Sequence, residues 1–61
     1  MRVGDLVKVK DEGPLTRYTL KDYKTKVGMI IRTNHQKRFN RFYVLVDGIV
    51  ILAWEIDLEL A

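Results

Sequence analysis

The sequence predicts an all-β fold, a small and strongly bent antiparallel barrel of five strands with a long first loop. Its 61 residues suffice for one core only, so residues 1–61 are expected to form a single domain. Five short segments are rich in apolar and β-branched residues, and an Asp-Gly pair joins two of them. The chain has no cysteine, which excludes a disulfide framework and a thiolate metal site.

The first predicted strand covers residues 5–10, because Val7 and Val9 alternate there with two lysines. Residues 11–26 lose this alternation and open with an Asp-Glu-Gly-Pro turn cluster, which predicts a long loop. A short helix near Leu20 and Tyr23 is a less favoured alternative, because this stretch has no strong helix cap.

The second predicted strand covers residues 27–33. Its alternation places three apolar side chains on one face, those of Val27, Met29 and Ile31. Between them, Gly28 indicates a point where another backbone segment approaches closely, because glycine inside a strand leaves such room.

A second loop is predicted at residues 34–40, which are polar and basic. It leads into a third strand at residues 41–46, and Asp47-Gly48 then joins this strand to a fourth at residues 49–54. An Asp-Gly pair between two β-prone segments favours a type I′ turn, because both central residues of that turn need a positive φ. The sequence therefore predicts a tight hairpin.

A tight turn at residues 55–57 and a short closing strand at residues 58–60 complete the five strands. This order of a long early loop, a tight hairpin and a short last strand is typical of a small SH3-like barrel. An OB-type barrel is less favoured, because it needs longer strands and a helix.

The predicted turn fixes the pairing of the hairpin strands from Val46–Ile49 to Arg41–Trp54 and makes both of its faces apolar. Continuous apolar strands belong to sheets that are covered on both sides. Either the long loop covers the second face, with Tyr18, Leu20 or Tyr23, or a second copy of the chain does. The residues of the predicted interface are Tyr43, Leu45, Val50, Leu52 and Trp54.

Charge is unevenly distributed along the chain. Residues 1–41 carry all eleven Lys and Arg and four acids, and residues 42–61 carry four acids and no base. Basic groups interleaved with aromatics suit nucleic acid, because cations neutralise phosphates and rings stack on bases. The alternatives are a solvated surface that keeps the protein soluble and an acidic protein partner, including pairing of Glu55, Asp57 and Glu59 with a basic loop of another copy. Candidate RNA or DNA contacts are Arg32, Lys37, Arg38, Phe39 and Arg41.

No enzyme is expected. His35 is the only histidine, and no carboxylate neighbours it in sequence to orient it as a base. The acids of residues 55–57 are interpreted as caps of backbone N–H groups rather than as a catalytic pair. We therefore assign no catalytic residue, metal ligand, cofactor or small-molecule substrate. The longest apolar segment has six residues and no signal peptide is evident, so a cytoplasmic protein without a membrane anchor is expected.

Several segments together carry a resemblance to a known group of proteins: residues 3–7 (VGDLV), 26–30 (KVGMI) and 43–48 (YVLVDG), Trp54-Glu55, and residues 57–59 (DLE). They resemble small SH3-like barrel proteins encoded by short reading frames of tailed bacteriophages, especially phages of marine cyanobacteria. The first two segments are also similar to the KOW-type barrels of ribosomal proteins and transcription elongation factors, which bind RNA or protein. The resemblance covers four of five strands and implies a fold more specifically than an activity.

One departure from these proteins concerns the segment after the Asp-Gly turn, which is usually polar but is apolar throughout at residues 49–53 here. The departure favours self-association. The sequence therefore predicts a binding or assembly module that forms a homo-oligomer through its hairpin face. A KOW-like nucleic-acid binder and a small protein that docks on a host enzyme are the two alternatives.

Overall fold

The computed structural model describes residues 1–35 and 40–61 and shows an all-β chain with five antiparallel strands in one sheet. The strands are β1 (Leu6–Val9), β2 (Val27–His35), β3 (Asn40–Val46), β4 (Ile49–Trp54) and β5 (Leu58–Leu60). Two single turns of 3₁₀ helix, η1 (Lys21–Tyr23) and η2 (Glu55–Asp57), interrupt the connections. The prediction of an all-β chain with five antiparallel strands is confirmed.

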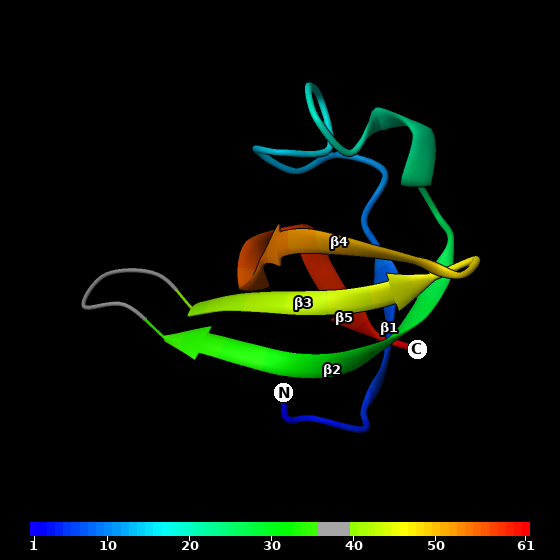
Figure 1. The fold of residues 1–61 in the computed structure, drawn as a ribbon. Coiled ribbons are helices and arrows are strands. Elements are labelled where there is room, and N and C mark those ends of the chain that lie inside the picture. Colours follow the sequence, from blue (N-terminus) through cyan, green and yellow to red (C-terminus); the bar gives the residue numbers. More distant parts are fainter. Residues whose placement is uncertain (36–39) are drawn as a thin grey trace.

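The strand order in the sheet is β4-β3-β2-β1-β5, so β4 and β5 are its two edges. In Figure 1, β2, β3 and β4 run side by side across the view, and β1 and β5 lie behind them at a steep angle. The sheet thus bends around one of its faces, which we call the inner face. The opposite side is the outer face.

Most predicted strand positions agree with the structure. The strands β4 and β5 match their predicted ranges, and β1 lies within its range. The second loop is predicted too long, because β2 continues to His35 and β3 begins at Asn40. The register extends this far through the pair His35↔Asn40, in which His35 Nδ1 lies 3.0 Å from Asn40 Oδ1. Polar side chains that bond each other across the strands are compatible with pairing at this exposed end.

The hairpin of β3 and β4 has the predicted register. Asp47 and Gly48 have φ values of 50° and 78°, as a type I′ turn requires. Because side chains directly opposite each other share a face, this register fixes which residues face inward. The six pairs are Val46↔Ile49, Leu45↔Val50, Val44↔Ile51, Tyr43↔Leu52, Phe42↔Ala53 and Arg41↔Trp54.

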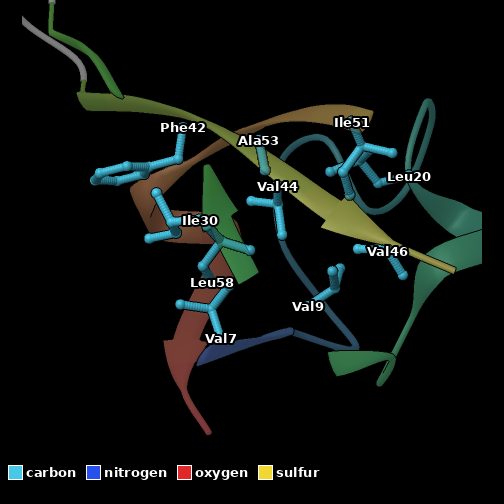
Figure 2. Packing of buried hydrophobic residues seen from close by; sticks show 10 residues of the cluster. All are labelled: Val7, Val9, Leu20, Ile30, Phe42, Val44, Val46, Ile51, Ala53 and Leu58. Atoms are coloured by element: carbon cyan, nitrogen blue, oxygen red, sulfur yellow. The ribbon is translucent and has the colours of Figure 1, made fainter. Parts of the chain in front are cut away.

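The core lies on the inner face (Figure 2). Its buried residues are Val7, Val9, Leu20, Ile30, Phe42, Val44, Val46, Ile51, Ala53 and Leu58. The predicted close approach at Gly28 is confirmed, because a Cβ there would lie 2.5 Å from the carbonyl oxygen of Leu45. Leu20 reaches this core from the long loop, and Leu15 and Tyr23 pack against it.

Asp57, at the end of η2, holds the long loop in place. Its carboxylate is fully buried, and Oδ1 accepts hydrogen bonds from the backbone N–H groups of Leu15 (3.0 Å) and Thr16 (3.3 Å). The hydroxyl of Thr16 donates a third, at 3.4 Å. Asp57 thus accepts from backbone N–H groups, as predicted for the acids of this turn, but the groups belong to the long loop, and Glu55 accepts from the side chain of Asn40 instead. The predicted pairing of Asp57 with a basic loop of another copy is wrong, because the buried side chain cannot reach another molecule.

Candidate functional site on the outer face of the sheet

A row of apolar side chains crosses the outer face. The pairs Leu6↔Met29, Met29↔Leu45 and Leu45↔Val50 place one residue from each of four adjacent strands side by side. All four are exposed, although they are as apolar as the residues of the core. We call this set, Leu6, Met29, Leu45 and Val50, the apolar row.

Two further rows follow along the strands toward the far end of the β3–β4 hairpin, away from its turn. The first consists of Arg32, Tyr43 and Leu52, and the second of Asn34, Arg41 and Trp54. A shift of register between Ile30 and Arg32 leaves Ile31 unpaired and exposed in the same strand. The outer face thus changes from aliphatic side chains to aromatic and cationic ones.

The two arginines of these rows neighbour aromatic residues. Arg32 Cζ stands 5.6 Å from the ring centroid of Tyr43, within the range of a cation–π contact. Arg41 is paired with Trp54 across the strands, and its Nε is buried without a hydrogen-bond partner. We call Arg32, Arg41, Tyr43 and Trp54 the cationic end of the outer face. Because the guanidinium group of Arg32 already lies over the ring of Tyr43, this ring is less available for stacking on a base.

The opposite end of the outer face, near the hairpin turn, carries paired charges. Lys26 Nζ lies 2.6 Å from Asp47 Oδ2, and Lys8 Nζ lies 3.7 Å from Glu59 Oε1. The hydrogen bond and charge of Asp47 raise the pKa of Lys26 above its ordinary value of 10.5. Within the part of the chain that the structure describes, Lys8 and Lys26 thus form ion pairs at this end, whereas Arg32 and Arg41 at the cationic end form none.

The long loop leaves the outer face open. Its apolar residue Leu20 is part of the core cluster, together with Val7 and Ile51. Tyr18 is 74% exposed and so covers little of the protein. The long loop therefore packs against the inner face. It is not the cover of the second hairpin face, which is part of the outer face.

All five residues of the predicted interface, Tyr43, Leu45, Val50, Leu52 and Trp54, lie on the outer face. Of the predicted nucleic-acid contacts, Arg32 and Arg41 lie together at the cationic end, and Lys37, Arg38 and Phe39 are outside the described residues. Sequence reasoning missed Leu6 and Met29. The alternation within each segment separates them from Val7 and Ile30, but only the pairing of β1 with β2 brings them into the apolar row.

The described residues contain no group of three or more His, Cys, Asp or Glu placed to hold a metal ion. They also contain no helix that is long and apolar enough to cross a membrane. The long loop forms a separate hollow of about 500 Å³, lined by residues 12–14, Arg17 and Tyr18. Comparisons with models of protein families, with curated proteins and with solved structures find no match. The outer face is therefore interpreted from its own chemistry.

Proposed function

We propose that this protein is a binding and assembly module without catalytic activity, and that it associates with a second copy of itself through its outer face. The observation that carries the proposal is the apolar row, which stays exposed across four strands while the long loop packs against the inner face. Soluble monomers rarely leave a contiguous apolar surface of this kind open to water. A second copy offers the same surface, as a two-fold interface requires.

The energy of such an interface can be estimated from the exposed side chains. Six aliphatic residues of the outer face are exposed by 37–56%: Leu6, Met29, Ile31, Leu45, Val50 and Leu52. Fully burying one such side chain contributes about 1.5–3 kcal/mol. Counting only the exposed fraction of each of the six side chains in both copies, two copies that cover each other gain about 8–16 kcal/mol. Association itself costs about 4–15 kcal/mol. The proposal therefore predicts modest affinity, which has to be measured from micromolar to millimolar concentration.

That the bent sheet is a barrel of the SH3-like type belongs to the same proposal. Three features support it: the strand order β4-β3-β2-β1-β5, the long connection between β1 and β2, and the single 3₁₀ turn η2 just before β5. We also propose a relationship to small phage barrels, and the basis for it is the set of sequence segments that resemble those proteins. A module of this type binds by surface recognition, so its partners depend on what its exposed face carries.

Native mass, measured by sedimentation, tests the assembly. The parent chain is expected at a multiple of 7.2 kDa. Leu45→Lys places a charge in the middle of the apolar row and is expected to lower the mass. Tyr18→Lys makes the same kind of change on the long loop and is expected to leave the mass unchanged. A parent chain that stays monomeric at millimolar concentration would rule out self-association.

Nucleic-acid binding is a second candidate, favoured by the two arginines and two aromatic rings that gather at the cationic end. It predicts that the parent binds single-stranded oligonucleotides with an affinity that falls steeply with salt. Arg32→Glu combined with Arg41→Glu is expected to abolish this binding. A monomeric parent without oligonucleotide binding would instead direct attention to another protein as the partner.

A further inference from the structure

Strand β4 is an edge strand with free backbone groups. It stands last in the strand order, next to β3 alone. The two-residue turn makes Val46↔Ile49 a hydrogen-bonded pair, and hydrogen-bonded pairs alternate with non-bonded ones in an antiparallel ladder. The N–H and C=O groups of Val50 and Leu52 therefore point away from β3. Among the described residues, no backbone hydrogen bond outside the strand ladders involves either of them.

The two edges of the sheet differ in how they are protected against further pairing. Proteins usually protect an edge by keeping it short or by placing charges, proline or a bulge on it. The edge strand β5 has three residues and carries Glu59, which pairs with Lys8. The edge strand β4 has six residues, with the sequence IVILAW, and has neither a charge nor a proline. Its pairing with β3 shows no bulge. Of the two edge strands of the described sheet, β4 is therefore the one without such protection.

The exposed side chains of β4 lie on both of its faces. Val50 and Leu52 are 51% and 38% exposed on the outer face. Ile49 is 52% exposed on the inner face, although its partner Val46 is completely buried. A second copy stacked on the outer face would cover Val50 and Leu52 but would leave Ile49 bare. A strand added beside β4 would cover side chains on both faces.

We infer that β4 pairs edge to edge with β4 of a second copy, as an antiparallel continuation of the sheet. The antiparallel direction follows from two-fold symmetry, which is the commonest way in which identical chains associate. A register centred on Ile51 places Val50 of one copy opposite Leu52 of the other, so the free backbone groups of these residues bond each other. This contact is additional to the stacking of outer faces proposed above, and both contacts together would link four or more chains.

The absence of cysteine makes the contact directly testable, because any introduced thiol is the only one in its chain. A disulfide needs two Cα atoms about 4.4–6.8 Å apart. Opposite residues of antiparallel strands meet this distance, whereas sheets stacked face to face are about 10 Å apart. A disulfide formed directly between copies therefore reports edge pairing and not the stacking of outer faces.

The experiment mixes the variants Val50→Cys and Leu52→Cys under mild oxidation and measures covalent dimer by mass. The mixture is expected to form a dimer that links position 50 to position 52. A dimer of Leu52→Cys with itself would also support edge pairing, with the register centred one residue later. The matched control mixes Tyr43→Cys with Leu45→Cys, which have the same spacing on the same face but lie one strand inward. Leu45 is 37% exposed, almost as much as Leu52, and this mixture is expected to stay monomeric on a denaturing gel.

Two results would overturn the inference in distinguishable ways. If the parent chain self-associates but neither position on β4 forms a disulfide, the copies meet without their β4 edges and only the outer-face proposal survives. If disulfides form on β4 while Leu45→Lys leaves the mass unchanged, edge pairing stands and the outer-face proposal fails. Equal cross-linking of the β3 control would show random collision, and edge pairing would then be wrong. Far-UV circular dichroism confirms that each variant is folded.

Discussion

The inner and outer faces of the sheet are built from alternate residues of the same strands, and they have very different surroundings. Phe42 and Val44 of β3 are buried in the core, whereas Leu45 of the same strand is exposed. Both faces are rich in apolar side chains, so composition does not decide which of them becomes the core. The decision comes from the bend of the sheet and from the long loop, which the carboxylate of Asp57 holds in place. An apolar face becomes a core only where another part of the chain can reach it.

The largest expected difference between the faces is in stability, at two neighbouring positions of β3. Phe42→Ala removes a fully buried ring and is expected to lower the free energy of unfolding by about 3–5 kcal/mol. Tyr43→Ala removes a half-buried ring on the outer face and is expected to cost much less, about 1 kcal/mol. Urea denaturation of both variants measures the difference. Equal losses would show that the outer face is as well packed as the core.

The anchor of the long loop has the next largest effect. Asp57→Ala leaves the buried N–H group of Thr16 and the partly buried N–H group of Leu15 without an acceptor and is expected to cost about 2–4 kcal/mol. Amide hydrogen exchange at these two positions is expected to accelerate more than exchange in β3. Glu55→Ala, at the exposed start of η2, serves as the control: it removes only an exposed hydrogen bond from Asn40, so it should lower stability much less and leave exchange at Thr16 unchanged. Unchanged exchange at Thr16 would contradict the role of Asp57 as the anchor.

A smaller effect of opposite sign is expected where the loop enters β2. Thr25 has a φ of 63°, a left-handed conformation that is unfavourable for a β-branched residue. Thr25→Gly removes this strain and is expected to stabilise the protein by about 0.5–1 kcal/mol, after allowance for the greater freedom of glycine in the unfolded chain. Thr19→Gly, in the same loop, is the control and should destabilise slightly. Thermal unfolding measures both, and a destabilised Thr25→Gly would exclude strain at this position.

The smallest effect concerns charge at the hairpin turn. Because the pKa of Lys26 is raised by Asp47, the ion pair stabilises the folded chain at pH values below 10.5. This contribution is lost as the pH rises through the folded-state pKa, when Lys26 becomes neutral. Lys26→Met is therefore expected to be slightly less stable than the parent at pH 7 and equally stable once the lysine has lost its proton. A difference that persists at high pH would mean that the side chain acts by packing and not by charge.

Local patterns predict the hairpin well and the remainder of the outer face poorly. Asp47-Gly48 fixes a turn type, and the turn fixes every pair between β3 and β4. The position of Leu6 beside Met29 depends on a pairing across the long loop, which no local pattern encodes. The same holds for Asp57, because its partners lie 41 and 42 residues away in the sequence. The alternation of apolar and polar residues places such a residue on one face of its strand, but it does not determine which residues of other strands lie beside it.

The end of β2 shows a second limit. Asn34 and His35 are polar and precede a basic stretch, which favours a loop, yet they continue the ladder with Arg41 and Asn40. Tertiary pairing overrides local propensity here, because a hairpin that has already formed adds further pairs at little cost. The register shift next to Ile31 is also invisible in the sequence, since a bulge inserts one residue without any special composition.

The carboxylate of Asp57 also sets an order of events during biosynthesis. Chains emerge from the ribosome starting with the amino end, at about 5–20 residues per second. The long loop of residues 11–26 is therefore made early, but its acceptor, Asp57, lies 41 and 42 residues after the two loop residues that it binds. The loop therefore cannot be anchored until residue 57 has been made. A fragment that ends before residue 57 would contain both strands of the β3–β4 hairpin but would leave the long loop without its anchor.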